Sequence, residues 1–145
     1  MKLREISKSD IDCLENSEYN NLSLEKRQEL IADSQKGVCR GKFFKFYVVE
    51  DNGECVGFIN MYAHSLSVIS VAPEIKLDCR RKGKGTQAVL LALEKAKEFG
   101  YKIALASIKE QNIASCKLQE KLGFEYMHTY ISKNGNTLRL YLKSL

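Results

Sequence analysis

Hydrophobic and polar residues recur along the chain with two periods, and these periods predict its secondary structure. Alternation at every second position, in stretches rich in β-branched and aromatic residues, predicts strands. These stretches cover residues 3–6, 44–50, 54–61, 67–71, 75–77, 102–108, 124–131 and 137–142. Apolar residues three or four positions apart predict helices. The helical stretches begin near residue 11 and then cover 24–35, 83–99 and 112–121.

Turn residues separate these stretches. The segment Asp51-Asn-Gly53 predicts a tight hairpin, because Asn and Gly tolerate positive φ. Pro73 predicts a break between the strand segments 67–71 and 75–77, because proline cannot donate a hydrogen bond to a sheet.

The order of the elements predicts an α/β sandwich in which a mixed, mostly antiparallel sheet of about seven strands is flanked by about four helices. A central β-α-β unit, from Ile75 to Ile108, predicts a parallel pair of strands. No linker, repeat or low-complexity segment divides the chain. We therefore expect residues 1–145 to form a single domain.

Composition narrows the class of protein. Of the 145 residues, 44% are hydrophobic and 28% are charged, which excludes a disordered or collagen-like chain. The apolar runs are too short for a membrane helix, and the first residues lack the apolar core of a secretory signal. The five cysteines form no Cys-x-x-Cys pair, which favours reduced thiols and a cytoplasmic protein without a metal site.

The net charge of +5 is concentrated in one segment. Five cations, opposed only by Asp78, fall within nine residues: Lys76, Arg80, Arg81, Lys82 and Lys84. The segment Arg80-Arg-Lys-Gly-Lys-Gly-Thr86 follows a predicted strand and begins a helix. Backbone amides at a helix N-terminus attract anions, and glycines let a phosphate approach closely. The segment therefore favours a phosphate-bearing partner over a merely solvated loop.

Three phosphate motifs can be compared with this loop. The P-loop pattern fails, because Thr86 rather than Lys follows Gly85. The dinucleotide pattern fits Gly83, Gly85 and Ala88, but no acid lies at the end of the next predicted strand. The pattern Arg/Gln-x-x-Gly-x-Gly/Ala is satisfied by Arg80, Gly83 and Gly85.

This third pattern resembles the pyrophosphate loop of the GNAT (Gcn5-related) N-acetyltransferases. A second segment strengthens the resemblance: Asn112-Ile-Ala-Ser115 followed by Leu118-Gln-Glu-Lys-Leu-Gly-Phe124 is similar to the family's Asn-x-x-(Ala/Ser) … Leu-Tyr-Glu-Lys-Leu-Gly-Phe. The resemblance covers the whole chain in layout and about Glu74 to Phe124 in motif. The absence of that Tyr makes the segment more like the branch that includes the ribosomal-protein N-terminal acetyltransferases.

The resemblance implies an enzyme that moves an acetyl group from acetyl-CoA to an amine. It implies that the loop amides cradle the pyrophosphate, that the cations pair with the CoA phosphates, and that the pantetheine arm lies along the preceding strand. Asn112 would bind that arm; its other role would be a helix N-cap, and the two roles are compatible. The cofactor-binding residues are then Ile75, Lys76, Leu77, Arg80, Arg81, Lys82, Gly83, Lys84, Gly85, Thr86, Asn112 and Ser115.

The catalytic groups are harder to assign. An attacking amine must be neutral, so a general base is useful, and Glu74 is our candidate, with His64 as a weaker one. Ser107 on the following strand could orient a water molecule. Gln119 stands where much of the family has the acidic Tyr, and glutamine cannot donate an acidic proton.

The acceptor and the partners follow from charge and from this resemblance. Acidic residues gather in the first helical region, which would suit a cationic amine of a small molecule or peptide: Asp10, Asp12, Glu15 and Glu18. We expect a monomer or a homodimer that binds no membrane. Two alternatives stay open: a CoA-binding or regulatory module whose catalysis is lost at Gln119, and a nucleic-acid binder that uses the basic loop.

Overall fold

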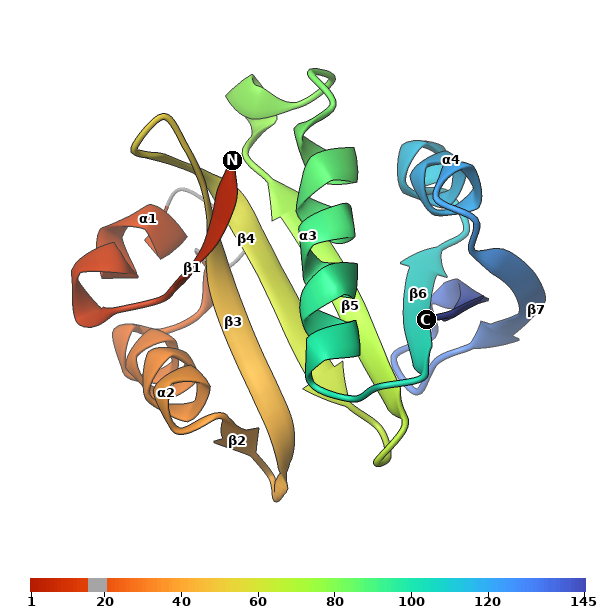
Figure 1. Ribbon diagram of the computed structural model, residues 1–145, viewed down its shortest axis with the longest axis horizontal. Helices are drawn as coiled ribbons and strands as arrows, with labels where there is room; N and C mark the ends of the chain where they lie inside the picture. Colours follow the sequence, from red (N-terminus) through yellow and green to blue (C-terminus); the bar gives the residue numbers. More distant parts are fainter. Residues whose placement is uncertain (16–20) are drawn as a thin grey trace.

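One open sheet runs across the molecule, with helices packed on both of its faces (Figure 1). The computed structural model describes residues 1–15 and 21–145. Within these ranges the sheet has eight strands, mostly antiparallel, in the order β1-β3-β4-β5-β6-β8-β7, with β2 paired to β3. The strands are β1 (Lys2–Glu5), β2 (Val38–Cys39), β3 (Lys42–Asp51), β4 (Glu54–Ala63), β5 (Val68–Ile75), β6 (Ile103–Lys109), β7 (Glu125–Ile131) and β8 (Thr137–Ser144).

The described helices divide between the two faces. They are α1 (Ile11–Glu15), α2 (Leu24–Lys36), α3 (Lys84–Glu98) and α4 (Ile113–Lys121), with short 3-10 turns at Lys8–Asp10 and Leu77–Cys79. Alternate residues of β3 and β4 pack on opposite sides. Tyr47 and Ile59 join the core under α3, whereas Phe46 and Phe58 join a second core that includes Leu14 of α1 and Ile31 of α2.

The predicted α/β sandwich and its mostly antiparallel sheet are confirmed. The 51–53 hairpin is also confirmed, with Asn52 and Gly53 at φ 51° and 80°. The sheet has one strand more than expected, because Val38 and Cys39 pair with Phe43 and Lys42 in a two-residue strand too short to show a period.

The predicted break at Pro73 is wrong, since β5 runs through it without interruption. The Lys76 N–H donates to Val56 O on β4, and His64 N–H donates to Val68 O, so the even-numbered residues of β5 bond to β4. Because successive residues of a strand direct their backbone groups to opposite sides, the nitrogen of Pro73 points away from β4. Its lack of a hydrogen therefore costs no hydrogen bond to β4.

The central parallel unit is confirmed, but the two strands pair over only a short length. Val68, Ile69 and Ser70 of β5 lie beside Ile103, Ala104 and Leu105 of β6. Beyond these residues β5 and β6 separate, while β6 stays paired with β8 as far as Lys109. The sheet is therefore open at its centre, at the end where α3 and α4 begin (Figure 1).

No helix within the described residues is long and apolar enough to cross a membrane.

Candidate functional site

The opening between β5 and β6 forms a cleft of about 340 Å³. It is bounded by β5, β6 and α4, and by the start of the β4–β5 turn. Its lining residues are His64, Ser70, Val71, Ala72, Pro73, Leu105, Ala106, Ser107, Ile108, Lys109, Asn112, Ser115 and Gln119.

Backbone polar groups line both walls of this cleft. Because the even-numbered residues of β5 bond to β4, Val71, Pro73 and Ile75 turn their backbone groups toward β6. On the other wall, Glu110 N–H donates to Thr137 O of β8, so alternation turns the backbone of Ser107 toward β5. The cleft can thus hydrogen-bond an extended chain that carries amides, as an added strand would.

The glycine loop lies at the mouth of the cleft, between β5 and α3. Arg81 and Gly83 adopt φ of 60° and 74°, and the first bond of α3 runs from Gln87 N–H to Gly83 O at 3.1 Å. The N–H groups of the first helical turn, 84–86, precede that bond, and Gly83 has no side chain to cap them. A Cβ built at Gly83 would meet nothing within 4 Å, so the chain is uncrowded at the residue that precedes these amides, and amides at a helix N-terminus attract anions.

The loop is held firmly against the cleft. A Cβ at Gly85 would lie 3.2 Å from Leu118 Cδ1 of α4 and 3.7 Å from Ile75 Cγ1 of β5. The start of α3 therefore packs closely on both elements, and a Cβ at Gly85 would require the Leu118 side chain to shift by a few tenths of an ångström. This contact fixes the anion-binding amides relative to the cleft walls.

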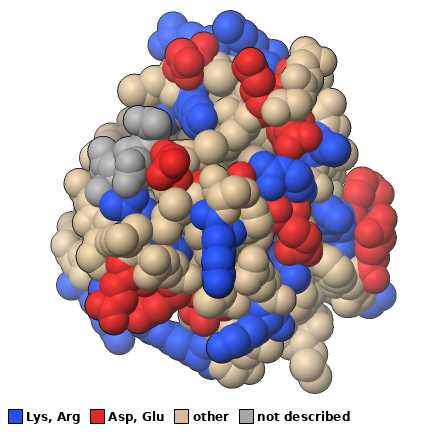
Figure 2. Space-filling model, turned by 90° about the vertical axis from the view of Figure 1, so that its left-hand side faces the viewer, with Lys and Arg blue, Asp and Glu red and all other residues tan. Residues whose placement is uncertain are grey.

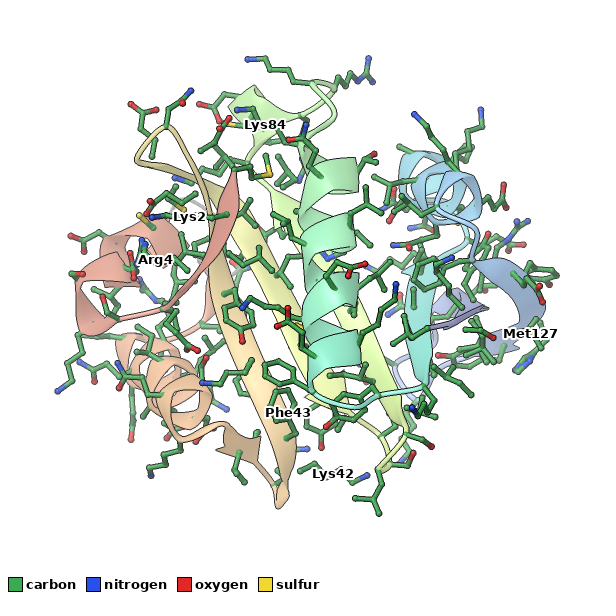
Figure 3. The ribbon with its side chains drawn as sticks, in the orientation of Figure 1. Lys2, Arg4, Lys42, Phe43, Lys84 and Met127 are labelled. Atoms are coloured by element: carbon green, nitrogen blue, oxygen red, sulfur yellow. The ribbon has the colours of Figure 1, made fainter. Side chains whose placement is uncertain are left out.

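The cations predicted to bind CoA phosphates fall into two groups, those that pair with another part of the protein and those that extend into solvent. Lys84 Nζ lies 2.6 Å from Asp51 Oδ2, and this hydrogen bond raises the pKa of Lys84 and lowers the pKa of Asp51 (Figure 3). Arg80 Nε donates to Ile75 O at 2.7 Å, which ties the loop to β5. Both side chains thus have structural partners.

Arg81 and Lys82 extend from the loop. Both are exposed, and Lys82 Nζ donates a long hydrogen bond, 3.4 Å, to Asp78 O. The loop lies at the upper end of the molecule in Figure 1, and Figure 2 shows Lys and Arg side chains at that end, beside Asp and Glu side chains. These two cations are the ones best placed to meet phosphates.

The strand residues assigned to the cofactor do not all face the cleft. Ile75 turns its backbone groups toward β6 but does not line the cleft, Lys76 bonds back to β4, and Leu77 lies in the 3-10 turn with 80% of its surface exposed. The sequence did not identify Val71 and Pro73, whose backbone groups turn toward the opening in the structure. The direction of each backbone group depends on the β4–β5 register, which no local motif encodes.

The residues assigned on α4 line the cleft together. Asn112 Oδ1 accepts a hydrogen bond from Ser115 N–H at 3.2 Å, so the predicted N-cap role of Asn112 is confirmed. The same bond fixes Ser115 beside it, and the amide nitrogen of Asn112 is not used by the cap. Gln119 follows one turn later and is only 1% exposed.

The catalytic candidates lie in different places. Ser107 lines the cleft, and its hydroxyl is 2.7 Å from the hydroxyl of Tyr130 on β7, a residue that sequence reasoning missed. Glu74 is half-buried on β5 opposite Phe58 and does not line the described part of the cleft. His64 lines the cleft, and its partial burial, helped by Lys42, lowers its pKa.

The acidic residues near the first helix are not all available to an acceptor. Asp10 is bound by Arg4 at 2.9 Å, so it has a structural partner, whereas Asp12 is exposed. Glu18 lies outside the described residues, as does the placement of the Glu15 side chain. Among the described residues no group of three metal-ligating side chains comes together.

Several solved structures share this fold. The Salmonella typhimurium protein yncA, solved with its cofactor acetyl-CoA, superposes with a TM-score of 0.81 at 17% identity, over 100% of this chain and 94% of that one. A ribosomal-protein-alanine N-acetyltransferase from Brucella melitensis gives 0.77 at 23% identity over 100% of both chains. An acetyl transferase from Salmonella typhimurium that modifies the N-terminal serine of ribosomal protein L7/L12 gives 0.81 at 14% identity, over 99% and 94%.

Comparisons of the sequence identify the family to which the chain belongs. No curated protein has a significantly similar sequence. The family model for the acetyltransferase (GNAT) family, however, matches residues 8–124, which include the glycine loop, the cleft walls and α4. The chain therefore belongs to the GNAT acetyltransferase family.

Proposed function

We propose that this protein transfers the acetyl group of acetyl-CoA to a primary amine of a small molecule or peptide, by direct attack within a ternary complex. The observation that carries the proposal is the joining of an open anion site to an amide-lined cleft. A molecule with phosphates at one end and an amide-bearing arm at the other matches both parts. CoA has this chemistry, and its thioester supplies the activated acetyl group.

The loop residues have distinct roles in holding CoA. The N–H groups of Lys84, Gly85 and Thr86 bind the pyrophosphate, helped by the positive end of the α3 dipole. Arg81 and Lys82 pair with the phosphates from the solvent side. Arg80 and Lys84 hold the loop in shape through Ile75 and Asp51.

The cleft walls support the chemistry of transfer. The β5 backbone near Val71 can donate an N–H to the carbonyl oxygen on which negative charge develops. A base must take the proton of the incoming ammonium, because a free amine has a pKa near 10.4. Glu74 is the proposed base, and Ser107 is proposed to orient the water that joins it to the amine.

The acceptor is proposed to be cationic before it reacts. The exposed Asp12 lies on the α1 side of the sheet, and an acidic surface attracts ammonium groups. One structural neighbour is described as modifying the N-terminal serine of a ribosomal protein, and another is named a ribosomal-protein-alanine N-acetyltransferase. Peptide amines therefore belong in the test beside polyamines and amino acids.

A thiol-release assay with acetyl-CoA and a panel of amines tests the proposal. We expect release of free CoA that depends on both the amine and the protein. Millimolar acetyl-CoA should also raise the melting temperature, since a ligand of the folded state stabilises it. A rise in melting temperature without turnover would favour the CoA-binding module instead, and a rise with RNA alone would favour the nucleic-acid binder.

A further inference from the structure

Gln119 places an unpaired polar atom in the wall of the cleft. The residue is 1% exposed and lines the opening from α4. Within residues 1–15 and 21–145, its side-chain carbonyl oxygen Oε1 has no hydrogen-bond partner. Burying such an oxygen unpaired costs about 1–3 kcal/mol. A ligand that enters the cleft and donates a hydrogen bond to this oxygen would remove that cost.

The fold itself does not require the amide at this position. The backbone C=O of Gln119 accepts bonds from Leu122 N–H at 3.1 Å and Phe124 N–H at 3.0 Å, and these end α4. Any non-proline residue could make the same backbone bonds. The adjoining core is apolar and includes Cys116 and Phe124, so an apolar side chain of equal length would pack there without an unpaired atom.

We propose that Gln119 is a recognition residue for the amide-bearing arm of CoA, with Oε1 accepting a hydrogen bond from an amide N–H of the arm. This inference rests on the proposed function of the cleft. Asn112 Oδ1 is already used by its cap to Ser115, whereas the Gln119 oxygen is not. With Gln119 on one wall and the β5 backbone on the other, an amide between them meets groups on both sides.

The proposal assigns Gln119 to binding and not to proton transfer. A primary amide does not titrate near neutral pH, so it cannot replace an acidic hydroxyl. It should therefore lower the dissociation constant of CoA while leaving the chemical step largely unchanged. The head group of CoA, which has phosphates but no arm, should not sense this residue.

Calorimetric titration of the variant Gln119→Met tests the proposal. Methionine has a similar length and no comparable acceptor. We expect the dissociation constant of CoA to rise about tenfold, which corresponds to ~1.4 kcal/mol. The dissociation constant of the head group alone, 3′-phosphoadenosine diphosphate, should not change. The melting temperature without ligand should stay equal or rise, because the unpaired oxygen is gone. The matched control is Lys121→Met, an exposed residue at the end of the same helix, which should leave all three values unchanged.

Two results would overturn the inference. One is CoA binding to Gln119→Met as tightly as to the original protein. The other is a parallel loss of head-group affinity, which would indicate a general distortion. If Gln119→Met does not fold, Gln119→Asn retains the amide but withdraws it by one methylene, and the same weakening specific to CoA is expected. Failure of the original protein to bind CoA at all would instead overturn the proposed function, and this inference with it.

Discussion

The hydroxyl groups of Ser107 and Tyr130 lie 2.7 Å apart, although their strands are not neighbours in the sheet. Strand β8 runs between β6 and β7, and the Tyr130 ring reaches across it. This hydrogen bond links the hydroxyl of Ser107, which lines the cleft, to the phenol of Tyr130. A phenol O–H can donate a proton, whereas α4 offers only the amide of Gln119 at the cleft.

Tyr130→Phe tests whether this phenol takes part in acetyl transfer. The change removes the hydroxyl and keeps the ring, so packing on β7 should persist. We expect kcat to fall about tenfold or more, toward the range of a lost acid–base group, with the acetyl-CoA dissociation constant nearly unchanged. Steady-state kinetics with a fixed amine, combined with calorimetry, separates the two quantities.

The matched control is Tyr126→Phe. Tyr126 is on the same strand, and its hydroxyl lies 2.6 Å from Thr129 Oγ1 rather than near the cleft. Equal losses in the two variants would show that Tyr130 contributes only to the stability of β7.

Charge reversal at Lys82 tests the division of the basic cluster. Because Lys82 is exposed and extends from the loop, Lys82→Glu should replace an attraction to phosphate with a repulsion and weaken CoA binding about tenfold. The salt dependence of binding should fall as well, since one contact of opposite charge is lost. Titration at low and moderate salt measures both effects.

Lys102→Glu provides the control for this change. Lys102 is exposed beyond the other end of α3, so the same change in net charge should have little effect on CoA affinity. A similar weakening in both variants would mean that net charge, and not the loop, attracts CoA.

Local sequence signals predicted much of the loop and its surroundings. The start of α3 and the cap made by Asn112 depend on residues close together in sequence, and both are confirmed. The Asn52-Gly53 turn follows the same logic. In these segments the conformation is decided by neighbours within one turn.

Contacts across the sheet could not be predicted in the same way. Lys84 of α3 meets Asp51 of β3, and Tyr130 of β7 meets Ser107 of β6, only because the tertiary fold brings distant segments together. The register of β4 and β5 likewise decides that Pro73 faces the opening. The sequence therefore predicted that Lys84 binds a phosphate, whereas in the structure its ammonium group pairs with the carboxylate of Asp51.

The Arg4–Asp10 pair makes stability depend on acid pH. Two guanidinium N–H groups of Arg4 contact Asp10 at 2.9 and 3.0 Å, and Nε contacts Glu50 at 2.6 Å. Bonding to Arg4 lowers the pKa of Asp10 below its ordinary 3.8. Because the folded pKa is the lower one, the contribution is present above about pH 4 and is lost as pH falls through the folded value.

Asp10→Asn should therefore reduce the free energy of unfolding at pH 7 by about 1–2 kcal/mol, since solvent around the partly exposed Arg4 limits the effect. Urea unfolding at pH 7 and pH 3 measures the difference between the variant and the original protein. That difference should shrink at pH 3. An equal difference at both values would show that the Asp10 charge is not its source.

Glu74→Gln tests the proposed base. The neutral amide keeps the shape of the half-buried side chain but cannot accept the amine proton, so activity at pH 7 should fall about a hundredfold or more. The loss should diminish toward pH 10, where more of the amine is already neutral. A rate–pH profile for the variant, set beside that of His64→Gln, measures this. We expect the His64 change to shift the profile less, because His64 lies in the β4–β5 turn, at the end where β5 is still paired with β6. A profile for Glu74→Gln parallel to that of the original protein would remove Glu74 as the base and favour His64, whose lowered pKa leaves the imidazole neutral at pH 7 and able to accept the proton.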